Sequence, residues 1–544
     1  MALDRKQKAF RYFPFMPFDA NNINFEQAIV RFLVLLHTKG KLITQTNRDV
    51  LYPENLVEII KGNKKDFEGI DEPIRERLIK NWIISDYATI VLEGKGRRGR
   101  ARISNLKPLH LSTIKLLDPR IRSQDRDISI FLYDVFKGTT IASDQGFLMD
   151  YLLEGTKRLG EYDLVIDESR FDSLDIETQF LLRLLENFKI DRPSIRVKLV
   201  QDYQFICEAH KNQFLSDILK LLVYKKSVPR RELFSYLTIV LNFHSALFAM
   251  KTFRQINSLV NNQKLRCNHC RTIRGETDFS KLGVCDFQPK IFVDLTLGQD
   301  KTCDFLAKKS AEQDYSEMYR YFKSHYKLAK LSEFAKTQGN SNPTIEQLME
   351  YLKNPYIDGV FNVKLGDIVN DEDLKDDLDI HSILGLNISP LDKYVEILCS
   401  DKSNWKNLIN RHKKLMAGLS NMNRDEGFLQ GGRGKKRKYV LGNLLLEVLV
   451  QLAVVSADIK IKSFKTQPIT IVSFVEWLKN RYGIYINEWP EGLDSPDIAK
   501  ALNNNYEALK SRLRQLGFYT DLSDASNSQV IKPRFKIEPQ LINV

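Results

Sequence analysis

Residues 495–517 read SPDIAKALNNNYEALKSRLRQLG and carry the clearest structural signal in the chain. A serine, a proline and an aspartate open the stretch, as at helix starts where the serine caps free N–H groups. Gly517 closes it, which is typical of a helix end. Apolar side chains recur at spacings of three or four, and they are Leu502, Tyr506, Leu509, Leu513 and Leu516. The stretch therefore predicts an amphipathic helix with one buried stripe.

The neighbouring segments place this helix in a definite order of elements. Before it, the sequence predicts a helix over 444–455, a short strand around Ile469 and a helix over 472–482 that ends at Gly483. After it, FYTDLS, DASN and SQVIKPRF predict a β-hairpin over 518–535. Helix, strand, helix, helix and hairpin is the order of a winged helix. We expect residues 431–544 to form a basic linker and a winged-helix domain.

The polar side of the predicted helix offers side chains that suit DNA. Asparagine and arginine reach the edges of adenine and guanine in the major groove, and the second arm of the hairpin adds two cations. The candidate DNA-binding residues of this domain are Asn503, Asn504, Lys510, Arg514, Lys532 and Arg534. Winged helices also dock proteins, and Glu507 places an acid on the same face. Protein docking therefore stays open.

Two glycine-containing stretches are strongly basic. Residues 94–103 read GKGRRGRARI and residues 431–439 read GGRGKKRKY, each with five cations and no acid. Cations on a glycine-loosened backbone can approach phosphates and release their counterions. The predicted phosphate contacts are Lys95, Arg97, Arg98, Arg100, Arg102, Arg433, Lys435, Lys436, Arg437 and Lys438. A solvated loop at the first stretch and a solubilising linker at the second are the alternatives.

The first basic stretch lies between ATIVLE and RARISNL, which predict the two strands of a hairpin. Helical spacing of apolar residues precedes it, beginning near Phe25, Leu56 and Glu72. Helices followed by a hairpin predict a winged-helix-like domain with a basic hairpin over residues 23–120.

Four of the six cysteines lie within 37 residues, which calls for an explanation other than a disulfide framework. Cys267 and Cys270 form CNHC, and two cysteines at this spacing fit one edge of a tetrahedral zinc site. The predicted zinc ligands are Cys267, Cys270, Cys285 and Cys303, although His269 could replace one of the last two. A site with four protein ligands is structural and not catalytic. Ordinary thiols and redox chemistry are the alternatives.

The remaining segments complete a multidomain chain of mainly α structure with small β elements (α+β). At 544 residues, the chain exceeds the size that one hydrophobic core usually organises. The apolar run over 233–250 contains Asn242 and His244, so it indicates a buried helix and not a membrane span. The other predicted segments are an aromatic arm (1–22), a mixed α/β segment (121–200), a helical region with the cysteine cluster (201–310) and a helical region with the acidic segment 365–380 (311–430).

The charge balance and the motifs limit the function. The chain has 82 lysines and arginines against 69 acids, and this net charge of +13 favours polyanionic partners. Phosphate-binding glycine loops, dinucleotide fingerprints and metalloprotease helices are absent from the sequence, so we do not expect ATP hydrolysis. Asp163 and Asp167 in YDLVIDES, or the acids of RSQDRD, could hold a metal for phosphodiester hydrolysis. The amino terminus lacks the apolar core of a secretory signal, so we expect a cytoplasmic protein.

Three segments carry a resemblance to a known family. They are FVDLTLGQDKTCDFLAKKSAEQDYSEMYRYF (292–322), LGNLLLEVLVQLAVV (441–455) and LKSRLRQLGFYTDLSDASNSQVIKPRF (509–535). The second half of the chain resembles prokaryotic accessory proteins of antiphage defence islands, of the methylation-associated defence type. The resemblance implies a bacterial cytoplasmic protein working beside separate ATPase, methyltransferase or nuclease subunits. These segments are not catalytic motifs, so they transfer no functional residue.

Together these observations predict a non-catalytic, zinc-stabilised protein that binds double-stranded DNA within a multi-subunit antiviral complex. Two alternatives remain. A metal-dependent nuclease subunit would use acids such as Asp163 and Asp167. A scaffold would use its winged helices to dock protein subunits and would have no DNA affinity of its own.

Overall fold

The computed structural model describes most of the chain. The described residues are 16, 18–44, 52–62, 73–93, 100–106, 110–116, 125–137, 148–159, 164–186, 196–199, 207–264, 267, 285–371, 377–432, 435–458, 463–492, 495–519, 530–538 and 540–541. Most of them are helical, and the strands are short. The prediction of mainly α structure with small β elements is therefore confirmed.

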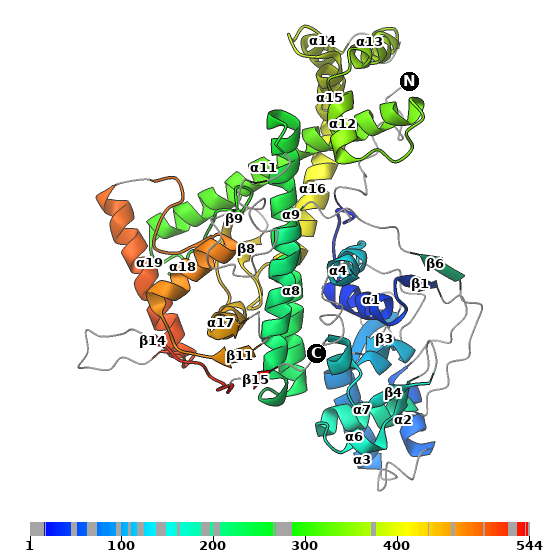
Figure 1. Ribbon diagram of the computed structural model, residues 1–544, viewed down its shortest axis with the longest axis vertical. Coiled ribbons are helices and arrows are strands. Elements are labelled where there is room, and N and C mark those ends of the chain that lie inside the picture. The colour runs from blue at the N-terminus through cyan, green and yellow to red at the C-terminus, as the bar shows by residue number, and fades with distance from the viewer. Residues whose placement is uncertain are drawn as a thin grey trace.

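The amino-terminal unit contains elements from both predicted segments, 23–120 and 121–200. Its elements are α1 (Phe25–His37), β1 (Lys41–Thr44), α2 (Pro53–Gly62), α3 (Pro73–Trp82), the π-helix η1 (Ile83–Tyr87), β2 (Ala88–Glu93), β3 (Arg100–Leu106), the 3-10 helix η2 (Leu111–Leu116), α4 (Ile128–Lys137), β4 (Thr156–Arg158), β5 (Leu164–Ile166), α6 (Glu168–Phe171), α7 (Ile176–Glu186) and β6 (Arg196–Leu199). β1 pairs antiparallel with β6, so that Lys41 faces Leu199. Phe32 of α1 packs on Phe136 of α4, with 5.2 Å between ring centroids. Residues on both sides of position 120 thus belong to one unit (Figure 1).

The hairpin expected around the first basic stretch is present. β2 and β3 pair antiparallel and coincide with the segments ATIVLE and RARISNL. Its tip, residues 94–99, lies outside the described residues.

Long helices form the centre of the molecule (Figure 1). They and their connections are α8 (Glu208–Leu222), η3 (Val223–Lys226), α9 (Arg230–Asn262), β7 (Ile291–Phe292), α11 (Lys301–Thr337), α12 (Ile345–Tyr351), α13 (Tyr356–Val369), α14 (Leu378–Leu384), α15 (Pro390–Ser400) and α16 (Lys402–Leu419). α9 is long and apolar enough to cross a membrane by length and composition, but 89% of its apolar window is buried inside the protein. It is therefore the core helix that the polar Asn242 and His244 indicated. The end of the aromatic arm also packs within the chain, because Phe18 contacts Phe131 and Phe248.

The carboxy-terminal unit follows the predicted order of helices. Its elements are β8 (Leu429–Gly432), β9 (Lys435–Tyr439), α17 (Asn443–Ala453), β10 (Val455–Asp458), β11 (Ser463–Thr466), β12 (Ile469–Thr470), α18 (Ile471–Tyr482), β13 (Ile484–Tyr485), α19 (Pro496–Gln515), β14 (Val530–Ile531) and β15 (Gln540–Leu541). The Ser495 hydroxyl caps α19 by accepting the N–H of Ile498, as the sequence predicted. Gly483 ends α18 at a φ of 71°, which only glycine adopts without strain. β12 pairs with β14, and β13 pairs parallel with the distant β7.

One apolar core joins these parts. Buried apolar side chains form a continuous cluster from Met16 to Ile537 that includes residues of α1, α9, α11 and α17. The chain therefore behaves as several units around a shared core, and the carboxy-terminal helices are held in place by the central ones.

Candidate functional site

A cleft of about 830 Å³ opens on the polar face of α19. Its walls come from five segments: the loop 295–300 before α11, the turn 423–425 after α16, residues 429–430 of β8, the junction 440–443 between β9 and α17, and α19 itself. Sites that hold small organic molecules have volumes of roughly 300–1,000 Å³. The cleft is therefore large enough for a ligand such as a nucleotide.

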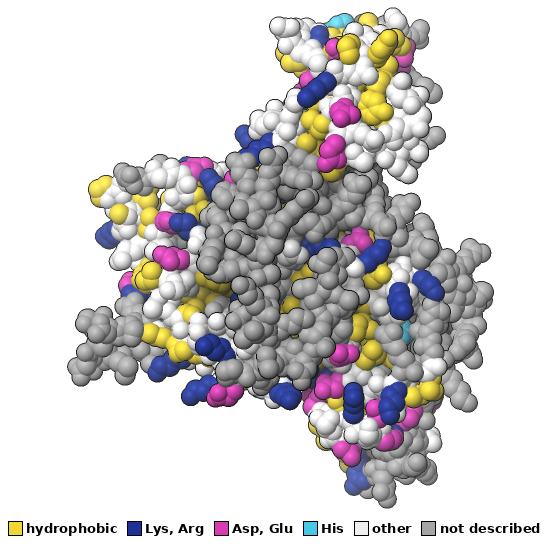
Figure 2. Space-filling model, in the orientation of Figure 1, with side chains coloured by type: hydrophobic (Ala, Val, Ile, Leu, Met, Phe, Trp, Pro, Cys, Tyr) yellow, Lys and Arg dark blue, Asp and Glu magenta, His cyan; other side chains and the backbone are white. Residues whose placement is uncertain are grey.

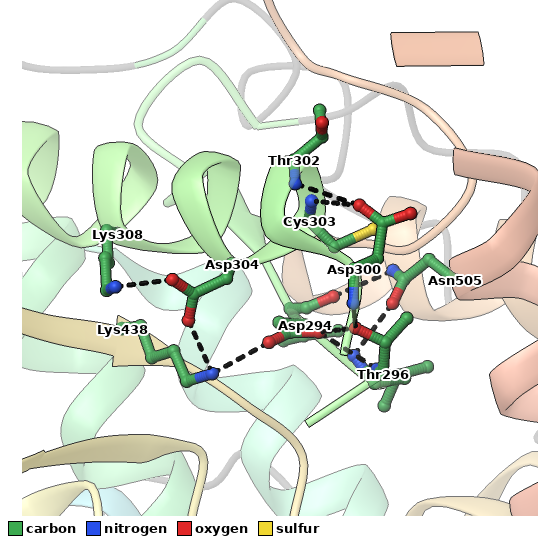
Figure 3. Close-up of polar contacts among 11 residues, drawn as sticks. Asp294, Thr296, Asp300, Thr302, Cys303, Asp304, Lys308, Lys438 and Asn505 are labelled. Carbon is green, nitrogen blue, oxygen red and sulfur yellow. Dashed lines mark hydrogen bonds and ion pairs between the residues drawn. The ribbon is translucent and has the colours of Figure 1, made fainter. Parts of the chain in front are cut away.

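The buried carboxylate of Asp294 fixes the start of the loop 295–300 (Figure 3). Asp294 is fully buried, and its Oδ1 accepts hydrogen bonds from the backbone N and the Oγ1 of Thr296 at 2.9 and 2.6 Å. Its Oδ2 binds the ammonium of Lys438 at 2.8 Å. At the tip, Leu297 has a φ of 56° and is 66% exposed. A large apolar residue in the left-handed region is strained, and such strain is typical of functional loops.

Lys438 belongs to the second basic stretch. The prediction that this stretch is a linker was wrong, because it contributes strand β9 and Lys438 is buried. Residues 429–432 and 435–439 pair as β8 and β9, and Lys438 lies buried between Asp294 and Asp304, each 2.8 Å from its Nζ. Burial lowers the pKa of Lys438, but the two carboxylates outweigh it and raise the pKa above its ordinary value. The ammonium therefore serves the fold and faces acids of its own chain, as Figure 3 shows.

The other cations of this stretch have different surroundings. Arg437 donates to the hydroxyl of Tyr315 and, at 2.9 Å, to the carbonyl of Lys413. Lys436 is exposed and pairs with Glu312 at 2.8 Å. Lys435 stands in β9, and Arg433 lies outside the described residues. The sequence missed the inward contacts of Arg437 and Lys438 because their acceptors lie more than 100 residues away or in the backbone.

The four predicted DNA-binding residues of α19 have different surroundings. Asn503 and Arg514 are exposed, whereas Asn504 lines the cleft and donates to Asp300 Oδ2 at 2.8 Å. Lys510 is largely covered, pairs with Glu507 at 2.7 Å and lies 4.7 Å from the centre of the Tyr506 ring. Asn503 and Arg514 are therefore exposed, with Arg514 5.8 Å from the centre of the Tyr519 ring, while Asn504 borders the cleft and Lys510 lies against its own helix.

Asn505 is the residue of α19 that the sequence reading missed. Its side chain is fully buried and makes three hydrogen bonds. Oδ1 accepts the N–H of Leu295 at 2.8 Å, and Nδ2 donates to the carbonyls of Val293 and Ile486 at 2.9 and 2.8 Å. These bonds fix α19 to the loop that forms the cleft. Its spacing of four residues from Leu509 could have indicated a buried amide on the apolar stripe.

Two guanidinium groups border the cleft. Arg512 donates to Oδ1 of Asn443 at the start of α17, and its Nη1 has no acceptor within the described part of the chain. Arg424, across the cleft, is exposed and makes no ion pair with any described residue. Guanidinium groups bind phosphate and carboxylate oxygens through paired hydrogen bonds. The amides of Asn443, Asn504 and neighbouring residues can both donate and accept.

The comparisons with known proteins place this chain in a family. The family model of the methylation-associated defense system protein MAD7 matches residues 5–535. The chain belongs to this family. No curated protein and no solved structure matches the chain significantly. Membership of the family confirms the resemblance that the second half of the sequence indicated, and it makes the protein a component of a methylation-associated, antiviral defence system.

The structure describes some of the cations in the two predicted winged-helix hairpins. Lys95, Arg97 and Arg98 lie outside the described residues, while Arg100 and Arg102 stand in β3 opposite Glu93 and Val91. Near the carboxy terminus, Lys532 is exposed. Arg534 pairs with Glu447 and donates to the carbonyl of Leu516 at 2.9 Å, so it binds its own chain.

The cysteines do not assemble in the described part of the chain. Cys303 is fully buried in α11, and its Sγ donates to the carbonyl of Ala501 at 3.1 Å. Burial raises the pKa of Cys303 to about 12, so this thiol packs α11 against α19 and is poorly suited to be a thiolate ligand. Cys270 lies outside the described residues, among which no group of three or more potential metal ligands occurs. Zinc at Cys267, Cys270 and Cys285 stays a prediction.

The acids proposed for a nuclease have structural roles where they are described. Asp167 caps α6 by accepting the N–H of Ser169, and it pairs with Lys157 at 2.8 Å. The hydrogen bond from Lys157 holds the pKa of Asp167 below its ordinary value. Asp125 is buried and binds Arg31 at 2.8 Å. Asp163 lies outside the described residues.

Proposed function

We propose that this protein is a non-catalytic, cytoplasmic component of its defence system that binds double-stranded DNA through its carboxy-terminal unit. The observation that carries the proposal is the strand pairing around α19. β12 lies between α17 and α18 and pairs with β14 beyond α19, and Lys532 N donates to the carbonyl of Phe518 at 3.0 Å. This pairing is the one expected of a winged helix, with α19 in the place of the recognition helix.

The contact surface consists of α19 and its cleft. Asn503 and Arg514 face solvent, and Arg424 lies across the cleft. Arginines would hold phosphates, while the amides would contact sugars or base edges. The net charge of +13 supports a polyanionic partner. Lys95, Arg97, Arg98 and Lys532 stay candidate phosphate contacts, whereas the buried Lys438 is excluded.

The proposal predicts that Arg424 and Arg514 make phosphate contacts. The double substitution Arg424→Gln, Arg514→Gln should weaken binding of a 30-base-pair duplex roughly tenfold or more at moderate salt. It should reduce the slope of log K against log salt by about 2, since each neutralised phosphate contributes about 0.9. Fluorescence anisotropy over a salt titration measures both values. Arg320→Gln, at a 68% exposed arginine of α11, is the matched control and should leave the slope unchanged. Equal slopes for the double variant and wild type would refute the contact surface.

We also propose a structural zinc ion held by Cys267, Cys270, Cys285 and His269. His269 takes the place of Cys303 in this ligand set, because the buried Cys303 thiol donates a hydrogen bond to the carbonyl of Ala501. Purified wild type should contain about one zinc per chain, and Cys267→Ser should lose most of it. Cys303→Ser, the matched control, should keep it. Mass spectrometry of the metal content decides the matter: a zinc-free wild type, or equal loss in both variants, would contradict this ligand set.

A further inference from the structure

A projecting helical lobe exposes an unusual amount of apolar surface. The lobe contains α13 and α14, with described residues 356–371 and 377–388, and stands at the top of the molecule in Figure 1. Seven of the fifteen large apolar side chains that are exposed among the described residues belong to it, and they are Tyr356, Val360, Val363, Val369, Leu378, Leu386 and Ile388. Figure 2 shows apolar side chains gathered on this part of the surface. Exposed apolar side chains gathered on one part of a surface are typical of interaction sites.

α13 is apolar on two sides, although only one side packs inside the chain. Its buried stripe contains Phe361 and Leu365, and Phe361 contacts the Tyr394 ring of α15 at 5.4 Å. Tyr356, Val360 and Val363 form a second stripe at spacings of four and three residues, and Tyr356 and Val363 are 79% and 66% exposed. A helix that is apolar around most of its circumference is normally covered on all sides. The second stripe therefore lacks a cover within the described chain.

Two glycines beside this stripe lack an explanation within the fold. Gly359 and Gly366 lie inside α13, where glycine is less favourable than alanine. A Cβ atom added at either position would meet nothing within 4 Å. At a contact surface, glycine allows the backbone of another molecule to approach closely. The glycines thus support the same conclusion as the exposed stripe, from a different observation.

The charge of the lobe indicates the kind of partner. Residues 356–388 contain eight acids and two lysines, a net charge of −6 in a chain whose total is +13. Asp358, Asp367, Asp377 and Asp379 are exposed around the apolar stripe. DNA would be repelled here, whereas a protein surface with apolar residues among lysines and arginines would be attracted.

We propose that the α13–α14 lobe docks another protein subunit of the defence system, one that presents an apolar surface beside lysines and arginines. The exposed stripe would supply the buried centre of the interface, and the acids would supply its rim. This role is separate from DNA binding by α19. The lobe would connect the DNA-binding unit to the rest of the assembly.

The test uses the full chain and each other purified protein of the same defence system. Wild type should bind at least one of them in biolayer interferometry, and binding should weaken as salt rises. Val363→Lys should weaken that binding at least tenfold. Val472→Lys, at a 58% exposed valine of α18, is the matched control and should change it less than twofold. The DNA affinity of Val363→Lys should equal that of wild type, so failure here is distinct from failure of the proposed DNA binding.

Gly359→Ala separates docking from folding. It should raise the melting temperature of the isolated chain, because alanine favours the helix and its Cβ meets no neighbour. The same variant should weaken the complex by several-fold. Absence of binding by wild type to every subunit, or full binding by Val363→Lys, would overturn the proposal. Self-association of wild type that Val363→Lys abolishes would also overturn it, since the lobe would then join two copies of this chain.

Discussion

Replacing Asp217 with alanine is expected to lower the free energy of unfolding by about 3–5 kcal/mol, because it removes one partner from a buried ion pair. Asp217 of α8 is fully buried, and its carboxylate binds Nη2 of Arg481 at 2.5 Å, Nε2 of His244 at 2.9 Å and the hydroxyl of Tyr482 at 2.7 Å. Burial raises the pKa of Asp217, but Arg481 and His244 together hold that pKa well below its ordinary value. Without the carboxylate, the Arg481 guanidinium would stay buried beside the carbonyl of Gln213 and lose the acid that binds it. Urea unfolding at neutral pH measures the loss.

Asp379→Ala is the matched control. Asp379 pairs with Lys402 at 3.2 Å, and the two side chains are 60% and 88% exposed. Exposed pairs contribute about 0–1 kcal/mol, so this variant should unfold at nearly the wild-type urea concentration. A loss below about 1 kcal/mol in Asp217→Ala would mean that the carboxylate does not hold Arg481 in place.

The Asp217 cluster also has a functional consequence. It joins α8 and α9 of the central helices to Arg481 and Tyr482 at the end of α18. α18 leads into β13, which pairs with β7 beside the loop that forms the cleft. The orientation of the cleft therefore depends on contacts made deep in the shared core.

Local signals in the sequence predicted the helices of the carboxy-terminal unit closely. Ser495, Pro496 and Gly517 bound α19 because capping and left-handed backbone depend on residues within one turn of the helix end. Gly483 ends α18 for the same reason. Such signals need no information from distant parts of the chain.

The contacts that build the site could not be predicted in this way. From the sequence, Lys438 is interpreted as a solvent-exposed phosphate contact. Its partners, Asp294 and Asp304, lie 144 and 134 residues away, so no local pattern indicates that the side chain is buried. Cys303 reads as a metal ligand beside Cys285, although the carbonyl that accepts its proton comes from Ala501 in α19. In both cases the fold supplies a partner that sequence spacing does not reveal.

Buried neutral histidines should make the stability of the protein depend strongly on pH. His110, His325 and His412 are buried, and burial lowers the pKa of each, to about 3 for His110 and His325 and to about 4 for His412. The geometry of His110 requires a neutral ring, because Nδ1 accepts the N–H of Ser112 at 3.0 Å while Nε2 donates to the carbonyl of Glu154 at 3.1 Å. In the unfolded chain each ring regains a pKa near 6.5.

Stability should therefore fall steeply as the pH falls below 6.5. The unfolded state binds protons that the folded state excludes, so the free energy of unfolding decreases by about 3 kcal/mol for the three rings between pH 6.5 and 5.5. Urea unfolding at pH 7.5, 6.5 and 5.5 measures this slope. His110→Gln should recover about 1 kcal/mol of the decrease between pH 6.5 and 5.5, because this ring no longer titrates. Constant stability between pH 7.5 and 5.5 would show that these rings can take up protons in the folded protein.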